Sequence, residues 1–178
     1  RELLGNLFGY EKAEFDSAYV AADTVKMHEK AYIMRSLLTD LDMLNAQHPF
    51  CTVDKWIDQA REFGQTPEVK DYYEMNARRL ITTWGGDLND YAVRNYSGLI
   101  ANYHAKRWEI YIDEAFRSVR TGTPFRDKER IKATNEFQLS FADKHGEQFP
   151  KYQGIELLSF SRALASKYAT ELQSWLTK

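Results

Sequence analysis

Chemistry in this chain is most readily expected at a corner between two helical segments, around Trp84. This tryptophan ends an apolar turn, and the following Gly85-Gly86 can adopt the left-handed conformation that closes a helix. Asp87 is a candidate N-cap for the next helix, with Asp90 in its first turn. An aromatic ring beside a helix N-terminus can line a polar ligand pocket. The pattern also fits a buried helix–helix corner with Trp84 in the core, so both interpretations stay open.

The other reactive residues do not form motifs for metal or nucleophilic chemistry. The four histidines have no second histidine at i+3 or i+4, and no Glu-x-x-His of a di-iron site occurs. Cys51 follows His48 closely, but closeness in sequence is not the spatial dyad that activates a thiol. Ser97 precedes Gly98 without the strand-to-helix turn of a nucleophile elbow. We therefore expect no metal, no cofactor and no catalytic nucleophile.

Composition excludes several classes of partner. A formal net charge of −2 argues against a nucleic-acid partner, which would normally meet a basic face. The single cysteine excludes an internal disulfide, and no apolar run approaches the ~20 residues of a membrane span. The chain begins at Arg1 inside a helical pattern without a secretory signal. We expect one all-helical domain over residues 1–178, and we interpret the chain as a fragment cut from a longer polypeptide.

Hydrophobic periodicity predicts an all-α fold, an irregular bundle of about seven helices without strands. One long central helix is expected from Leu88 to Arg120, with a bend around Gly98–Ala105, where its apolar stripe changes position. The other expected helices span Arg1–Val25, Lys26–Asn45, Thr52–Gly64, Thr66–Trp84, Asp127–His145 and Ile155–Leu176.

A set of short motifs, taken in order, resembles the C-terminal helical region of the alpha-N-acetylglucosaminidases, a family of glycoside hydrolases. The matching pieces are Tyr73-Glu74-x-Asn76-x-Arg78, Leu80-x-Thr82-x-Trp84-Gly85, Asp90-Tyr91-Ala92, Gly98-Leu99-x-Ala101-Asn102-Tyr103 and Arg107-Trp108. Weaker similarity extends upstream to Trp56-x-x-Gln59-Ala60-Arg61 and downstream to Phe137-Gln138-Leu139. No single piece is specific, but the ordered set is.

The resemblance directs attention to paired carboxylates. A retaining glycosidase needs two carboxyls about 5–5.5 Å apart on either side of a sugar. Carboxylates that are neighbours along one helix mostly face water, so we expect the pairs in this chain to be solvated. The family resemblance implies that the catalytic pair lies in a preceding (β/α) barrel domain, outside this chain. The neighbouring pairs are Asp54/Asp58, Asp71/Glu74, Asp87/Asp90 and Asp113/Glu114.

The resemblance also implies a role for Trp84, Leu88 and Tyr91 in the wall of the sugar pocket. An indole ring can stack on a sugar face, a leucine can exclude water, and a tyrosine hydroxyl can hydrogen-bond a hydroxyl or acetamido group. Two positions depart from the family pattern. The turn Gly85-Gly86-Asp87 is shorter than the proline-containing turn common among relatives, and Ala105 stands where many have proline.

Two functional hypotheses follow. The first is a C-terminal domain that packs on a missing catalytic barrel and helps the full-length enzyme to hydrolyse terminal alpha-linked N-acetylglucosamine. The isolated chain would then be inactive and could self-associate, and the resemblance implies a periplasmic, secreted or lysosomal location. The alternative is a self-standing helical interaction module whose exposed aromatic residues bind a protein partner. Neither hypothesis involves a nucleic acid or a membrane.

Overall fold

Helices make up nearly all of the regular secondary structure in the described part of the chain. The computed structural model describes residues 1–84, 94–149 and 154–177. Apart from an isolated parallel bridge between Thr52 and Ser97, these residues contain no β structure, so the predicted all-α class is confirmed. The elements are α1 (Glu2–Val20), α2 (Thr24–Asn45), α3 (Val53–Arg61), α4 (Pro67–Leu80), a π-helical turn η1 (Ile100–His104), α5 (Ala105–Thr121), α6 (Asp127–Asp143), α7 (Leu157–Lys167) and α8 (Ala169–Leu176).

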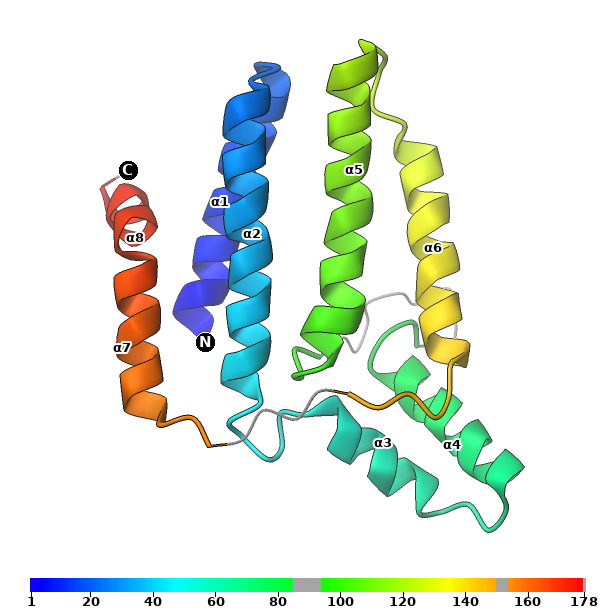
Figure 1. The fold of residues 1–178 in the computed structure, drawn as a ribbon. Coiled ribbons are helices and arrows are strands. Elements are labelled where there is room, and N and C mark those ends of the chain that lie inside the picture. Colours follow the sequence, from blue (N-terminus) through cyan, green and yellow to red (C-terminus); the bar gives the residue numbers. More distant parts are fainter. Residues whose placement is uncertain (85–93, 150–153, 178) are drawn as a thin grey trace.

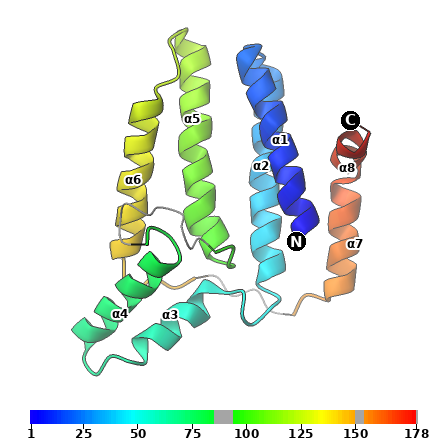
Figure 2. The same ribbon diagram turned by 180° about the vertical axis from the view of Figure 1, so that it is seen from behind.

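Helical hairpins build the bundle (Figure 1). The α1–α2 hairpin stands beside the α5–α6 hairpin, and α3 and α4 form a third hairpin across the lower end of α6. The last two helices, α7 and α8, lie along the outer edge of the α1–α2 hairpin. Figure 2 shows the reverse side, where α1 lies in front of α2. Hydrogen bonds tie α8 and the α7–α8 junction to the first hairpin, from Tyr10 to Ser174 and from Tyr168 to Asp40.

Three apolar clusters form the core. The first joins α1, α2, η1 and α7, the second joins α1, α2 and α5, and the third joins α3, η1, α6 and the segment after α6. Because apolar burial is the main favourable term in folding, these clusters fix the relative positions of the hairpins. Their buried members include Leu7, Leu37 and Ile100 in the first, Phe15, Met34 and Ile112 in the second, and Val53, Leu99, Tyr103 and Phe141 in the third.

The predicted long central helix is wrong over its first part. Residues 94–98 are not helical, and the regular helix starts only at α5, after the π-helical turn η1. The reason is Asp42 of α2, whose carboxylate accepts hydrogen bonds from the backbone N–H of Gly98 (2.7 Å) and Ala101 (3.1 Å). The Asp42 carboxylate caps the first turn. It accepts the hydrogen bonds that backbone carbonyls would accept if the helix began earlier in the chain. The bend expected around Gly98–Ala105 coincides with η1.

Two further helix boundaries differ from the expectation. The expected first helix stops at Val20 instead of Val25, because Asp23 caps α2 by accepting a hydrogen bond from Lys26 N–H at 3.0 Å. The expected last helix is divided at Tyr168, whose backbone departs from helical geometry while its hydroxyl donates to the buried Asp40. Within the described residues, none of the helices is both long and apolar enough to cross a membrane.

Candidate functional site

The candidate corner starts where α4 ends, at Leu80. Residues 81–84 form a turn, in which Trp84 N–H donates to the carbonyl of Arg79 at 2.7 Å. Trp84 itself has a φ of 49°, the left-handed conformation that the sequence pattern assigned to Gly85-Gly86. A bulky residue rarely adopts this conformation, so the turn places the indole in a direction that a continued helix would not. The prediction that α4 continues to Trp84 and is ended by the glycines is therefore wrong.

Trp84 lies at the surface of the described chain. The residue is 38% exposed, while Thr82 and Thr83 just before it are buried. The interpretation of Trp84 as a core residue therefore does not fit this chain, and its role in a sugar pocket stays a prediction. The other two predicted pocket residues, Leu88 and Tyr91, lie in residues 85–93, outside the described residues, as do Gly85 and Gly86.

A buried ion network fixes the end of α4. Arg78 is fully buried and donates two hydrogen bonds to Oε1 of Glu74, from Nε at 3.0 Å and from Nη2 at 2.8 Å. Its guanidinium lies between the rings of Phe141 and Phe149, 5.0 and 5.1 Å from their centroids. It also donates to the carbonyl of Phe141 and to Glu147, each at 3.3 Å. The last turn of α4 is thereby attached to α6 and to the segment that follows it.

The second oxygen of Glu74 is occupied as well. Glu74 Oε2 accepts hydrogen bonds from Arg61 of α3 at 2.5 Å and from the backbone N–H of Gly146 at 3.1 Å. Arg61 also binds Asp71 at 2.8 Å. A buried charge is tolerated only where it is paired and fully hydrogen-bonded, and this arrangement meets that condition for Glu74. Through this network the α3–α4 hairpin and the C-terminal end of α6 together support the turn that ends in Trp84.

The expectation that neighbouring carboxylates are solvated is wrong for Glu74 and Glu114. Glu74 is 1% exposed and Glu114 is 8% exposed. Hydrogen bonds from Arg117 and Arg126 hold the pKa of Glu114 down to about 2. Both glutamates face arginines, so each serves an ion network and neither faces a second carboxylate across a cleft. Asp87 and Asp90 lie outside the described residues.

The chain that follows residues 85–93 is held in place at its first residues. The carbonyl of Arg94 lies 2.9 Å from Nε2 of His104, and the carbonyl of Asn95 accepts a hydrogen bond from Asn45 Nδ2 at 2.6 Å. Ser97 donates to the buried Asp42, whose pKa is raised by burial despite its three hydrogen bonds. Fixed structure therefore lies on both sides of residues 85–93.

An apolar groove opens between α3 and α4 beside the corner. It encloses about 570 Å³, and its wall includes Trp56 and Phe63 from α3 and the turn after it, and Tyr73 and Leu80 from α4. Phe63 is 72% exposed and Leu80 is 43% exposed. Tyr73 and Leu80 are seven positions apart, so they share one face of α4. Exposed aromatic and aliphatic side chains gathered in one groove are typical of an interaction surface.

The structure brings Cys51 and His48 into contact, although their closeness in sequence did not by itself predict a thiol–imidazole dyad. The Cys51 Sγ lies 3.7 Å from His48 Nδ1, and Arg1 Nη1 donates to the same sulfur at 3.3 Å. The contact arises because the turn after α2 folds back on itself, with Cys51 N–H donating to the carbonyl of His48.

The described residues hold no group of three or more His, Cys, Asp or Glu side chains placed to bind a metal ion.

Comparison with known proteins defines the class of protein to which this chain belongs. Residues 1–167 match the family model described as the alpha-N-acetylglucosaminidase (NAGLU) C-terminal domain. The chain belongs to this family, a C-terminal helical domain of glycoside hydrolases. It is 30% identical over 163 residues to human alpha-N-acetylglucosaminidase, a match that covers 89% of this chain and 21% of the human protein.

Solved structures show the same fold. The chain is similar, with a TM-score of 0.78 and 25% identity, to a family 89 glycoside hydrolase from Clostridium perfringens in complex with 2-acetamido-1,2-dideoxynojirmycin. A second structure from this organism, in complex with its substrate GlcNAc-alpha-1,4-galactose, gives a TM-score of 0.80 at 24% identity. Each match covers 93% of this chain and 20% of the other. The chain thus spans about a fifth of the length of its relatives.

Proposed function

We propose that this chain is the C-terminal domain of a glycoside hydrolase that removes terminal alpha-linked N-acetylglucosamine. The remainder of that enzyme, a catalytic barrel, would supply the acid and the nucleophile. This chain would complete the sugar pocket with Trp84, Leu88 and Tyr91. The family match supports this proposal over a self-standing interaction module, because the named relatives are hydrolases about five times longer than the chain.

The observation that carries the proposal is the fixed and exposed position of Trp84. A pocket wall must hold its shape when the sugar binds, because loose positioning loses transition-state stabilisation. The turn that presents the indole follows directly on the buried Arg78–Glu74 pair. The residue is 38% exposed, so part of it is accessible for a sugar to stack on. The buried Arg78–Glu74 pair thus holds in place the turn that presents the exposed Trp84.

The α3–α4 groove supports the proposed contact with a barrel. Its lining is mostly apolar, and covering it would remove Phe63, Tyr73 and Leu80 from water. Apolar burial contributes about 25 cal/mol per Å², so an adjoining domain would be held there by the hydrophobic effect. Leu80 also precedes the turn that ends in Trp84. A barrel seated on the groove would therefore lie next to the indole.

In this proposal the chain binds and excludes water, and it does not move protons on the substrate. The described carboxylates that are buried at the corner pair with arginines, as Glu74 does, so they are unsuited to act as acid or nucleophile. A ring stacked on the sugar, together with apolar side chains at the rim, would lower the local dielectric and strengthen the charges of the barrel's two carboxyls.

The test compares the 178-residue chain with the longer polypeptide that contains it. Both are incubated with an aryl alpha-N-acetylglucosaminide, and release of the aryl alcohol is followed. We expect turnover by the longer polypeptide and none by the chain alone. Turnover by the repurified chain would contradict the proposed division of roles, and a longer polypeptide that is inactive on this substrate would contradict the proposed activity.

A further inference from the structure

Glu11 of α1 carries a carboxyl group that is enclosed in the bundle. The residue is 0% exposed, and neither of its carboxyl oxygens has a hydrogen-bond partner among the described residues. Lys30 Nζ of α2 lies 3.1 Å from Glu11 Oε2, but the same nitrogen also lies 3.3 Å from Oε1 of Glu29. A buried carboxylate keeps its charge at low cost only where it is paired and fully hydrogen-bonded. One ammonium group shared with a second carboxylate does not meet that condition for Glu11.

A second carboxyl group reaches this region from the last helix. α8 packs on α1, where the hydroxyls of Ser174 and Tyr10 lie 3.0 Å apart, and its Leu172 and Trp175 pack on the first apolar cluster. Glu171 belongs to the same helix, and its Oε2 is buried without a hydrogen-bond partner in the described part of the chain. The charge of Glu171 acts on the carboxyl of Glu11. Packing α8 on α1 therefore brings two carboxyl groups together.

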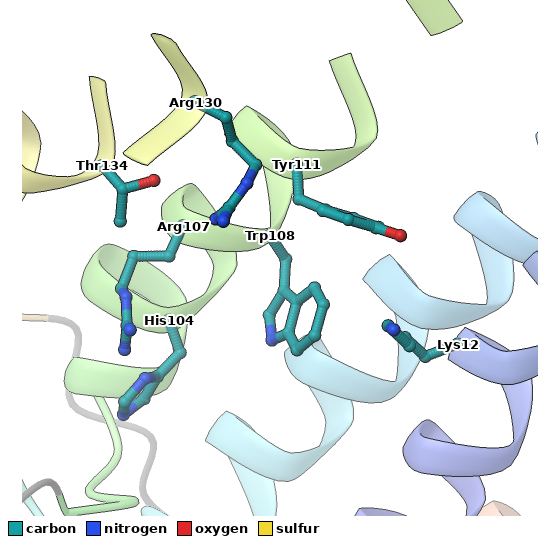
Figure 3. A pocket seen from close by; sticks show the side chains of 7 residues that line it. All are labelled: Lys12, His104, Arg107, Trp108, Tyr111, Arg130 and Thr134. Atoms are coloured by element: carbon teal, nitrogen blue, oxygen red, sulfur yellow. The ribbon is translucent and has the colours of Figure 1, made fainter. Parts of the chain in front are cut away.

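The neighbouring lysines already have carboxylate partners of their own. Lys12 follows Glu11 in sequence, but it lines the cavity around Trp108 (Figure 3) and is paired with Asp16. Two more lysines in this part of the bundle are engaged in the pairs Lys26–Glu14 at 3.0 Å and Lys167–Asp40 at 2.7 Å. Among these groups the carboxylates outnumber the cations, so Glu11 and Glu171 share no further positive charge that could balance both.

The direction of the pH effect follows from these contacts. Burial raises the pKa of Glu11 above its ordinary value of 4.5, and the charges of Glu171 and Glu14 raise it too, whereas Lys30 lowers it. Burial lowers the pKa of Lys30, but Glu11 and Glu29 raise it overall, so Lys30 stays charged at neutral pH. When α8 leaves α1, the charge of Glu171 is removed, so the packed arrangement binds the Glu11 proton more tightly than the open one. Packing of α8 is therefore favoured at acid pH and weakens as the pH rises above 4.5.

We propose that the packing of α8 on α1 is a pH-sensitive contact, firm while the Glu11 carboxyl carries a proton and loosened when Glu11 and Glu171 are both ionised. A protonated carboxyl can donate a hydrogen bond, whereas two ionised carboxyls only accept and repel each other. Loosening uncovers the apolar side chains of Leu172 and Trp175. The residues matched to the family model end at 167, before α8, so this contact does not rest on the proposed pocket at Trp84.

Hydrogen exchange of the 178-residue chain, measured by mass spectrometry, tests this contact. Protection factors, corrected for the intrinsic pH dependence of amide exchange, are compared at about pH 5 and about pH 8 for a peptide from α8 and a peptide from α5. We expect the protection of α8 to fall about fivefold to tenfold at the higher pH, the equivalent of a pKa difference of up to about one unit. The protection of α5 should stay the same, because α5 does not contact this pair of carboxyls.

Glu171→Gln keeps the shape of the side chain and removes its charge. It should preserve the protection of α8 at about pH 8 and reduce the change between the two pH values to less than about twofold. Ser174→Ala is the matched control on the same helix, because it removes the hydrogen bond to Tyr10 without changing any charge. It should lower the protection of α8 by a similar factor at both pH values.

Three results would overturn the proposal. In the first, α8 of the original chain is equally protected at both pH values. In the second, Glu171→Gln leaves the pH dependence as it was. In the third, the α5 peptide loses protection by the same factor as α8, since the pH effect would then belong to the whole bundle and not to the contact between α8 and α1.

Discussion

Arg78 and Glu74 form an ion pair that is closed to solvent, with Arg78 Nη2 2.8 Å from Glu74 Oε1 and side chains 0% and 1% exposed. They lie one helical turn apart on α4, and Glu74 also binds Arg61 of α3. Through the contact between Glu74 and Arg61 the pair links α4 to α3, just before the turn that presents Trp84. Its removal should therefore be felt both in the stability of the hairpin and in the position of the indole.

Glu74→Gln is expected to lower the free energy of unfolding by about 3–5 kcal/mol, since it leaves the buried Arg78 with only the partly exposed Glu147, 3.3 Å away, as a charged partner. Urea denaturation of the 178-residue chain measures the change. The matched control is Glu136→Gln on α6, whose pair with Lys132 is exposed on both sides, and it should change stability by no more than about 0.5 kcal/mol. Equal effects of the two substitutions would contradict the role of the buried network.

Gly98→Ala is expected to destabilise the chain by about 2–4 kcal/mol. Gly98 has a φ of 83°, and an added Cβ would lie 2.7 Å from Val53 Cγ1 and 3.1 Å from the side chain of Phe149. Thermal or urea denaturation checks this value. Gly5→Ala on α1 is the control, because a Cβ there meets no atom within 4 Å and favours the helix. A Gly98→Ala chain as stable as the original would show that the turn can move.

The lowered pKa of Glu114 predicts that the chain becomes less stable at acid pH. Its pKa is lowered from 4.5 to about 2 by Arg117 and Arg126, so the folded chain holds the ionised form more strongly than the unfolded chain does. The stabilisation is present above pH 4.5 and is lost as the pH falls toward 2. Urea denaturation from pH 7 to pH 2.5 should show the original chain and Glu114→Gln converging in stability. A constant difference over this range would contradict the assignment.

The helices of this chain could be predicted from sequence because apolar periodicity reports local burial. The α2 stripe of Leu37 and Leu41 lies in the core, as expected. The start of the central helix could not be predicted, because it depends on Asp42, distant in sequence, capping Gly98 and Ala101. A carboxylate that caps a distant helix leaves no local pattern.

The candidate site rests on a different kind of information. The corner at Trp84 stands out in the local pattern, its role in a sugar pocket is implied by family resemblance and stays a prediction, and the structure adds the exposure of Trp84 and its left-handed backbone. The burial of Glu74 was missed, because carboxylates at helical spacing usually face water. A signal was present in the sequence, since Glu74 and Arg78 are spaced i, i+4 and both fall in the motifs that resemble the family.

The α3–α4 groove predicts self-association of the isolated chain. An apolar surface without its partner domain tends to bind a second copy, so sedimentation over a wide concentration range should show reversible association. Leu80→Ser should weaken the association, because Leu80 is 43% exposed in the groove. Tyr32→Ser is the control, an aromatic residue 69% exposed on α2 outside the groove, and it should not. A chain that stays monomeric at high concentration would argue against a large missing interface.

Trp84 is central to the proposed sugar pocket, and one paired measurement tests its role directly. Trp84→Ala should lower the unfolding free energy of the chain by less than about 2 kcal/mol, because the residue is 38% exposed. In the longer polypeptide the same change should lower kcat/KM on an aryl alpha-N-acetylglucosaminide at least about tenfold, or about 1.4 kcal/mol. Trp175→Ala on α8 should leave kcat/KM unchanged. A chain destabilised by about 3–5 kcal/mol, or an enzyme that keeps its activity, would show that Trp84 serves packing and not the sugar pocket.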